Sequence, residues 1–573
     1  MLTKLIVKNF KRFETAEVEL GNPVVFIGPN NSGKTTALQA LALWETGLKR
    51  WNEKRKGEKS LGKRPGITMN RRDLVALPVP NAKLLWQNLH VRDSGQVNGK
   101  SETTNVRIDI IVEGVTESEQ WKCGLEFDYA NPESLYCRPL RLSEEKGSNR
   151  MPIPKLAEQV KLAFLPPMSG LASNETRLDS GAIDVRIGEG RTAEVLRNLC
   201  YNICDKDKKL WEKLRKRIDD CFGVSLNEPR YIQERGEFEM SYKEGGIPLD
   251  LSSAGTGLQQ TLLLLSYMYS NPGAVLLLDE PDAHLEILRQ REIYRLLNDG
   301  ARENENQIII ASHSEVLLNE AAGKEVVVAF VGKPHRINDK GSQVLKSLNE
   351  IGWEQYYQAE QRGWVLYLEG STDLTILQTF AENLDHKQAM KALEKAFVHY
   401  VGNQPNEVNR HFYGLKEAIP DLKGIAIFDR LAQEPQSLPE RQILMWKRRE
   451  IENYLCNTES LDAYAENTAL EDAGPLFASE RVNTMRSAIK EVEQAMKTLG
   501  KGSPWDANTK VSDDFLEPLF ETYFQKLDLP NLMRKKSFHE LARFVPTEKI
   551  DTEITEKLDA IVRVCESARP ADF

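Results

Sequence analysis

A chain of 573 residues is too long to fold around one hydrophobic core, so its length predicts two or three domains. Hydrophobic residues make up 40% and charged residues 28%, and no apolar run is long enough for a membrane span, which excludes a membrane-embedded protein. The formal net charge of −9 argues against a uniformly basic nucleic-acid binder but leaves local basic patches open. Seven cysteines without a CxxC pair, and no signal-peptide pattern, predict a reduced, cytoplasmic protein.

A phosphate-binding loop follows the first predicted strands. Residues 1–20 alternate as two strands, and 24–27 form a short apolar strand. The next residues fit the pattern G-x-x-x-x-G-K-[ST] and lead into a helical run, so backbone N–H groups, a lysine and a threonine hydroxyl are expected to bind ATP phosphates and Mg²⁺. The predicted ATP-binding residues of this loop are Gly28, Asn30, Asn31, Ser32, Gly33, Lys34, Thr35 and Thr36.

The segments after this helix are less specific. Residues 49–72 are strongly basic, and two interpretations stay open: a DNA-facing flap near the nucleotide, or a solvated loop. Residues 106–112 and 121–127 alternate like antiparallel strands of a side sheet. Residues 189–222 are helical by period, with a break near Asp205, and this insertion is too short for a long coiled-coil arm.

Residues 251–314 supply the other parts of an ATPase head. Apolar runs at 275–278 and 308–310 are typical of parallel strands buried on both faces. The first run precedes Asp279, which can hold Mg²⁺ through water, and Glu280, which can orient and deprotonate the attacking water. The second run precedes His313; a lone histidine is more often a core or loop residue, but its place at a strand end favours contact with the γ-phosphate.

A loop just before the helix of this block is the remaining ATP-binding candidate. Residues 252–257 supply a hydroxyl and small residues ahead of a helix, as a backbone nest for phosphate requires. Ser253 and Gly255 are the predicted phosphate contacts of this loop.

A second domain is predicted to begin near residues 350–360. Its strands, 365–368, 397–401 and 424–428, are followed or flanked by acidic residues, and a later segment, 446–455, adds two more. Carboxylates gathered from separate strand ends predict divalent-metal binding at a phosphodiester. The alternative is salt bridging and helix capping. The acidic candidates are Glu369, Asp373, Asp429, Glu450 and Glu452.

These motifs together resemble a known family. The opening residues resemble the ATPase heads of the SMC and OLD (overcoming lysogenization defect) families, and the order E-G-x-x-D, strand-D, R-E-I-E-N-Y-L resembles a TOPRIM domain. The chain therefore resembles an OLD-family nuclease, the architecture of the Gabija endonuclease and of retron-associated effectors. The implied fold is α/β: an ABC/SMC-like P-loop ATPase head with a side β-sheet and helical insertion, then a TOPRIM-like α/β domain with helical additions.

The resemblance implies domain limits and site roles. The ATPase domain would span 1–350, the TOPRIM-like core 351–456 and its helical part 457–573. Glu369 would be a metal ligand and the base, Asp373 a second acidic ligand, Asp429 the central ligand, and Glu450 or Glu452 would complete the site. Lys535 or Lys536 would act against transition-state charge. The family strand reads D-x-D, whereas this chain has Asp429-Arg430-Leu431 and lacks the second carboxylate.

The implied function is an ATP-binding, nucleotide-regulated DNA endonuclease in antiphage defence that uses Mg²⁺ or Mn²⁺. Because ABC heads pair the phosphate loop of one head with the signature loop of another, the resemblance also implies a homodimer or higher homo-oligomer. A neighbour-encoded helicase, a reverse transcriptase with its DNA–RNA product, or no partner fits equally, and no membrane is expected. Two alternatives stay open: an SMC-like DNA-repair ATPase with a degenerate, non-cleaving TOPRIM domain, and an ATP-switched interaction protein.

Overall fold

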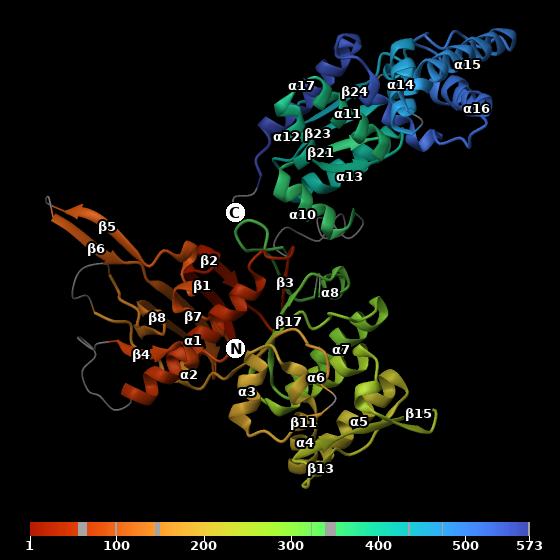
Figure 1. Ribbon diagram of the computed structural model, residues 1–573. Coiled ribbons are helices and arrows are strands. Elements are labelled where there is room, and N and C mark those ends of the chain that lie inside the picture. Colours follow the sequence, from red (N-terminus) through yellow and green to blue (C-terminus); the bar gives the residue numbers. More distant parts are fainter. Residues whose placement is uncertain are drawn as a thin grey trace. The chain divides into compact units, whose positions relative to one another are not determined.

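The computed structural model describes residues 1–55, 66–97, 100–143, 149–172, 174–321, 324–337, 351–433, 436–472 and 474–570. The chain forms two compact units, Met1–Leu345 and Lys346–Asp572. Figure 1 colours the first unit from red to green and the second from green to blue. Within the described ranges no helix combines the length and the apolar character that a bilayer span requires.

A parallel sheet in the first unit carries the predicted ATPase motifs. Its strand order is β10-β17-β18-β3-β19-β20, and all neighbours are parallel except β19 and β20. The strands are β3 (Val24–Ile27), β10 (Leu162–Leu165), β17 (Val275–Asp279), β18 (Gln307–Ser312), β19 (Val326–Ala329) and β20 (His335–Arg336). Every residue of β3, β17 and β18 is buried, which confirms the prediction of strands covered on both faces.

An antiparallel sheet of order β2-β1-β7-β8-β9-β4 completes the core of the first unit. Its strands are β1 (Leu2–Phe10), β2 (Phe13–Glu19), β4 (Ile67–Asn70), β7 (Ile108–Thr116), β8 (Glu119–Asn131) and β9 (Ser134–Pro139). Helix α1 (Lys34–Arg55) packs against strands of both sheets. Gly47 permits this close approach, because a Cβ there would lie 2.9 Å from the Phe127 ring and 3.1 Å from Cys137 Sγ.

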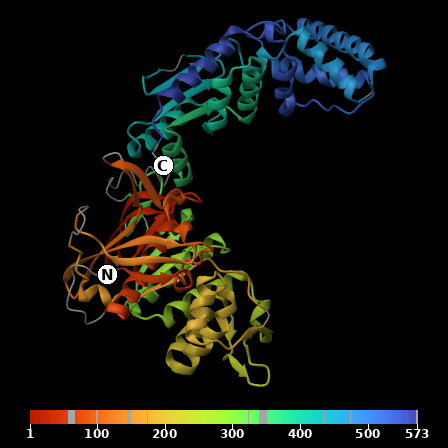
Figure 2. The same cartoon turned by 60° about the vertical axis from the view of Figure 1, so that its left-hand side comes forward.

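The helical insertion forms a separate group within the first unit. Figure 2 shows α4 (Leu196–Lys206) and α5 (Lys208–Phe222) away from the orange strands of the antiparallel sheet. The break between them lies at Asp207, whose side chain accepts hydrogen bonds from Lys209 N and Leu210 N and so begins α5. The break therefore falls two residues after the predicted position. The other helices of the unit are α2 (Lys155–Glu158), α3 (Ser180–Gly188), α6 (Thr256–Ser270), α7 (Ile287–Glu303) and α8 (Glu315–Ala321).

This unit also contains small strands that the sequence patterns did not predict. They are the hairpin β5 (Arg92–Val97) and β6 (Lys100–Asn105), and the two three-stranded sheets of β11 (Glu175–Thr176), β13 (Arg230–Ile232) and β14 (Glu237–Glu239), and of β12 (Ser225–Leu226), β15 (Ser241–Glu244) and β16 (Ile247–Asp250). Since most are two to four residues long, they carry too few positions for a period to be recognised.

The second unit is built on a four-stranded parallel sheet of order β22-β21-β23-β24. Its strands are β21 (Trp364–Leu368), β22 (Phe397–Tyr400), β23 (Lys423–Phe428) and β24 (Arg441–Met445). The first three match predicted strands. The helices along the sheet are α10 (Trp353–Arg362), α11 (Ser371–Asn383), α12 (Lys387–Lys395), α13 (Pro405–Ala418) and α17 (Thr552–Ser567).

Further helices gather beyond one end of this sheet, in blue in Figures 1 and 2. They are α14 (Thr458–Asp472), α15 (Ala478–Thr498) and α16 (Glu517–Lys526), followed by a 3-10 helix over Lys535–Phe544. α17 then returns to pack on β21 and β23. One continuous hydrophobic core joins the sheet to these helices, so the tail belongs to the same folded unit.

Candidate functional site

The phosphate-binding loop joins β3 to α1, and hydrogen bonds from Lys34 to two of its carbonyl groups hold it. The Lys34 ammonium group donates hydrogen bonds to Gly28 O at 2.8 Å and Pro29 O at 2.9 Å. Gly33 (φ 107°) and Asn31 (φ 63°) lie in the left-handed region, which turns the loop inwards. The Ser32 hydroxyl is buried without a hydrogen-bond partner among the described residues. A buried, unpaired donor in a loop of inward-facing N–H groups suits a bound anion.

The first acidic strand end lies beside this loop. The Thr35 hydroxyl donates to Asp279 Oδ1 at 3.1 Å, so the structure brings the two predicted Mg²⁺ ligands of the head together. Asp279 is 5% exposed. Burial raises the pKa of Asp279 to about 6, although the hydrogen bond from Thr35 lowers it. A divalent cation would relieve the cost of burying this charge.

Glu280 and His313 meet at the ends of neighbouring strands. β18 lies between β17 and β3, and its register pairs Asp279 with Ala311 and Ser312 with Ile27. His313 Nδ1 consequently stands 3.5 Å from Glu280 Oε1, and Glu280 N donates to Ala311 O at 2.8 Å. Both side chains are partly exposed at the edge that carries the phosphate loop. This arrangement can hold a water molecule for attack on a terminal phosphate.

The signature-type loop is held by its own contacts. The Asp250 carboxylate accepts from Ser252 N at 2.8 Å, and the Ser253 hydroxyl donates to Asp250 O at 2.6 Å. Ser253 and Gly255 are exposed, and within the described residues no hydrogen bond or ion pair joins them to the phosphate loop. The structure thus separates these two candidates from the rest of the predicted ATP-binding set, which surrounds the β3–α1 junction and includes Asn30 and Thr36.

The basic stretch 49–72 is partly used by internal ion pairs. Arg50 pairs with Glu53 at 3.0 Å and with Asp73 at 2.9 Å, and Arg71 pairs with Glu133 at 2.8 Å. Residues 56–65, where the predicted DNA-facing flap is centred, lie outside the described residues.

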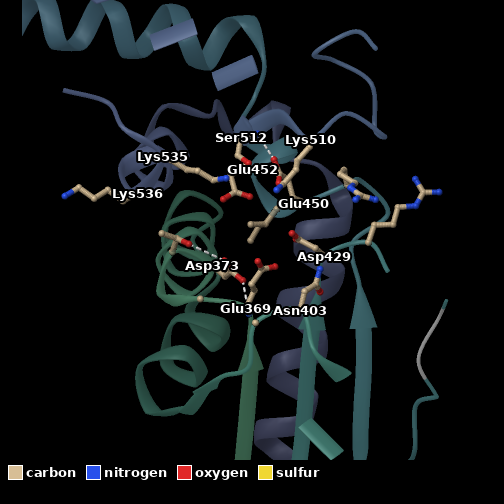
Figure 3. A pocket seen from close by; sticks show the side chains of 16 residues that line it. Glu369, Asp373, Asn403, Asp429, Glu450, Glu452, Lys510, Ser512, Lys535 and Lys536 are labelled. Carbon is tan, nitrogen blue, oxygen red and sulfur yellow. Dashed lines mark hydrogen bonds between the residues drawn. The ribbon is translucent and has the colours of Figure 1, made fainter. Parts of the chain in front are cut away.

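The acidic candidates of the second unit line one cavity of about 760 Å³. Glu369 and Asp429 follow the adjacent strands β21 and β23, Asp373 lies in the first turn of α11, and Glu450 and Glu452 flank the start of a 3-10 helix over Ile451–Tyr454. Figure 3 shows the carboxylates of Glu369, Asp429, Glu450 and Glu452 turned towards a common space. All five candidates therefore meet at one edge of the sheet.

Two of these carboxylates have backbone partners. Glu369 N donates to Asp373 Oδ2 at 3.1 Å, and Ser512 N donates to Glu450 Oε1 at 2.5 Å. Among the described residues, no hydrogen bond or ion pair reaches the Asp429 carboxylate. Hydrogen bonding and capping thus account for part of the acidic set and leave Asp429 unexplained.

Mutual repulsion and burial dominate the electrostatics of the cavity. The pKa of Asp429 is raised to about 9, first by burial and then by Glu369 and Glu452. The pKa of Glu452 is raised to about 8, first by burial and then by Glu450. The pKa of Asp373 rises to about 6 for the same two kinds of reason. Such shifts mark a group of buried carboxylates that repel one another.

The carboxylate side chains of this cavity do not converge on one point. Among the described residues, no three His, Cys, Asp or Glu side chains stand in the arrangement that holds a metal ion. The donor set nevertheless fits a hard divalent cation, because carboxylate oxygens are its preferred ligands.

Sequence patterns missed several residues that line the same cavity: Asn403, Arg430, Arg449, Lys510 and Ser512. Lys510 and Ser512 come from a polar segment with no recognisable motif. Of the two predicted basic residues, Lys535 contacts Asp513 as well as lining the cavity, and Lys536 lies further out in Figure 3.

Family models match both halves of the first unit. Residues 1–113 match a model described as "AAA ATPase domain", and residues 152–319 match one described as "AAA domain, putative AbiEii toxin, Type IV TA system". These matches agree with the P-loop ATPase fold of the first unit.

One curated relative is an OLD nuclease from Thermus scotoductus, 22% identical over 327 residues. The alignment covers 55% of this chain, which spans about three-fifths (59%) of the relative's length. The predicted resemblance to the OLD-family ATPase nucleases is thereby confirmed.

Solved structures similar to this chain include two SMC heads. The SMC head domain from Thermotoga maritima is 15% identical, covers 59% of this chain and 98% of its own, and has a TM-score of 0.30. An Smc head with an extended coiled coil, bound to the C-terminal domain of ScpA derived from Pyrococcus furiosus, is 13% identical, covers 61% and 99%, and has a TM-score of 0.34.

Proposed function

We propose that this chain, similar to the OLD nucleases, is an ATP-binding, nucleotide-regulated and metal-dependent DNA endonuclease that serves in antiphage defence. In this proposal residues 1–350 form the ATPase, 351–456 a TOPRIM-like nuclease core and 457–573 its helical part. The observation that carries the nuclease assignment is the cavity in which five carboxylates share one edge of the parallel sheet.

Roles in the ATPase site follow from its contacts. Lys34 would leave the two loop carbonyls to bind the β and γ phosphates, and the Thr35–Asp279 pair would hold Mg²⁺. Glu280 would orient and deprotonate the attacking water, with His313 beside it to contact the γ-phosphate.

The second cavity would bind a phosphodiester over its carboxylates. Bound divalent cations would polarise a phosphate oxygen and stabilise the charge of the displacement. Asp429 would be the central ligand, since it follows β23, one of the two inner strands, and its carboxylate has no other partner among the described residues. Glu369 would accept a proton from the attacking water, and Lys535 would face the negative charge that develops on the phosphate.

A composite ATP site would link the two activities. Ser253 and Gly255 are exposed and separate from the phosphate loop, so a second copy of the chain would have to present them to it. ATP would then favour one arrangement of a homo-oligomer, and this arrangement would set the access of DNA to the nuclease cavity. ATP regulates cleavage in this way only if it binds one arrangement better than the other.

Plasmid cleavage tests the proposal. The full chain is incubated with supercoiled plasmid and Mg²⁺ or Mn²⁺, alongside Glu369→Ala and Glu280→Gln. We expect nicking to disappear in Glu369→Ala while ATP turnover persists, and ATP turnover to disappear in Glu280→Gln. The matched controls are Glu394→Ala, an exposed carboxylate on α12, and Glu244→Gln, an exposed carboxylate on β15.

Two outcomes would contradict the proposal. Nicking that survives in Glu369→Ala would assign it to a contaminant or to another site. Cleavage rates that do not depend on ATP concentration would remove the regulatory link but not the nuclease itself.

A second candidate function is a DNA-repair ATPase with a non-cleaving C-terminal unit. It is favoured by Leu431, which stands where the family has a second acid, and by the absence of three converged ligands among the described residues. ATP turnover and DNA binding without nicking in any divalent metal would support it.

A further inference from the structure

The acidic cavity of the second unit is also lined by positive side chains, which are more exposed than four of its five acids; the fifth acid, Glu369, is exposed as well. Asp373, Asp429, Glu450 and Glu452 are buried or half-buried. The cations are all exposed: Arg430, Arg449, Lys510, Lys535 and Lys536. The cavity therefore has an acidic floor and a basic rim.

The lysines on one part of the rim are tied to a carboxylate outside the floor. Lys510 Nζ lies 2.6 Å from Asp513 Oδ2, and Lys535 contacts Asp513 as well. These ion pairs lower the pKa of Asp513. Asp513 thus orients both lysines and neutralises one of their two charges.

The arginines are held differently. Arg430 donates to the neutral amide oxygen of Asn508 at 2.6 Å, and within the described residues neither Arg430 nor Arg449 forms an ion pair. Three loops are joined at this point, because Arg430 N donates to Arg449 O at 3.1 Å and Arg449 N donates to Ala507 O at 2.7 Å. Both arginines consequently extend from backbone segments that hydrogen bonds hold in place. Within the described residues, no carboxylate neutralises their positive charge.

If the arginines served only to neutralise the floor, they would pair with its carboxylates, because an exposed arginine beside an acid gains from a bidentate contact. Asn508 instead holds Arg430 without reducing its charge. Uncompensated guanidinium groups next to a phosphodiester site are suited to bind a second anion.

We propose that Arg430 and Arg449 bind a phosphate next to the scissile one, so that the cavity binds a nucleic-acid strand more tightly than an isolated phosphate diester. One phosphodiester lies over the carboxylates, and the neighbouring phosphate lies against the two arginines. This inference rests on the proposed nuclease function and specifies the substrate class of the same cavity.

A double variant, Arg430→Gln/Arg449→Gln, tests the assignment in the full chain. Binding of a short fluorescein-labelled DNA strand and of the matching duplex is measured at several salt concentrations in Ca²⁺. We expect affinity to fall about tenfold for each arginine removed. The slope of log K against log salt should fall by about 0.7 for the single strand and about 0.9 for the duplex, since the two arginines together neutralise one phosphate.

Two matched variants separate charge from folding. Arg410→Gln removes a 76% exposed guanidinium group on α13 that pairs with Glu407, and it should leave the slope unchanged. Arg430→Lys/Arg449→Lys keeps both charges and should retain most of the slope. A double glutamine variant with the wild-type slope overturns the assignment.

A small substrate distinguishes the neighbouring phosphate from the scissile one. Bis(p-nitrophenyl) phosphate contains one phosphodiester and no neighbour, so the double variant should hydrolyse it as fast as the wild type does while its DNA cleavage falls. Equal losses on both substrates would place the arginines at the scissile phosphate and refute the proposal. If the wild type cleaves neither substrate, the nuclease function fails; if the double variant cleaves both like the wild type, only the arginine assignment fails.

Discussion

The two sites of this chain use the same topological position with opposite electrostatics. Both lie at the carboxyl ends of parallel strands, where open α/β sheets bind ligands. In the first unit the polar groups satisfy one another: Lys34 bonds to loop carbonyls, Thr35 to Asp279, and His313 faces Glu280. In the second unit Asp429 and its acidic neighbours repel each other.

This difference indicates two kinds of ligand site. In the first site the side chains already form hydrogen bonds with one another and with the loop carbonyls, so ATP would have to replace hydrogen bonds of similar strength. The second holds buried carboxylates that repel one another, so a bound cation would relieve that repulsion. We therefore expect each bound ligand ion to raise the free energy of unfolding of the second unit more than that of the first.

Loss of the phosphate-binding lysine should give the largest effect. Lys34→Ala removes the charge that stabilises the transferred phosphate, and ATP turnover should fall by about 10²–10³-fold. Nicking measured without ATP should stay at the wild-type level, because the second cavity keeps its carboxylates. The measurement is phosphate release beside plasmid nicking; a parallel loss of ATP-free nicking would show that the two sites are not separable as described.

Metal binding should stabilise the second unit by an intermediate amount. Mn²⁺ at about 100 times its dissociation constant should add about 2.7 kcal/mol to the free energy of unfolding. Calorimetry in EDTA and in Mn²⁺ measures this as a rise of the unfolding transition. The rise should shrink in Asp429→Asn and persist in Glu394→Ala; an equal rise in Asp429→Asn would place the ion elsewhere.

The smallest expected effect is a loss of stability at acid pH that arises from His411, a histidine with a hydrogen-bond partner at each ring nitrogen. His411 is buried, accepts from the Tyr367 hydroxyl at 2.9 Å and lies 2.6 Å from Gln355 Oε1. Its pKa is lowered to about 3, first by burial and then by His399. Because the unfolded chain protonates this residue below about pH 6.5 and the folded chain does not, stability is present above that pH and lost below it, by about 1.4 kcal/mol per pH unit.

Urea unfolding between pH 7 and pH 5 measures this slope. The variant His411→Gln lacks the titrating group, so its stability should decline less steeply with acid than that of the wild type. Identical slopes in the two proteins would show that His411 is not buried in its neutral form.

Local patterns were sufficient for the first site and for part of the second. The loop Gly28–Thr35 and the acidic strand end at Asp279 are contiguous motifs, and the strands beside them carry unbroken apolar runs. Glu369 and Asp429 could be proposed because each directly follows such a run. Strand β24 was missed because its sequence, RQILM, has three apolar residues after a charged and a polar one.

The basic rim could not be predicted in the same way. Lys510 lines the cavity, and Asn508 contacts Arg430, from a loop whose Ala507 O accepts a hydrogen bond from Arg449 N, far away in the sequence. Such contacts depend on tertiary packing, which no period or spacing reports. Arg430 occupies the variable middle position of the D-x-D pattern, so the motif indicates nothing about its hydrogen bond to Asn508.

Helix α1 gives the first unit a property that neither sheet has alone. Lys34, which we propose to bind the nucleotide, and Gly47, which packs against the antiparallel sheet, belong to one helix. A bulkier side chain at position 47 would tilt that helix and misalign the cradle more than three helical turns away. A larger side chain at position 47, although it is far from the phosphate loop, would thus weaken the affinity for ATP.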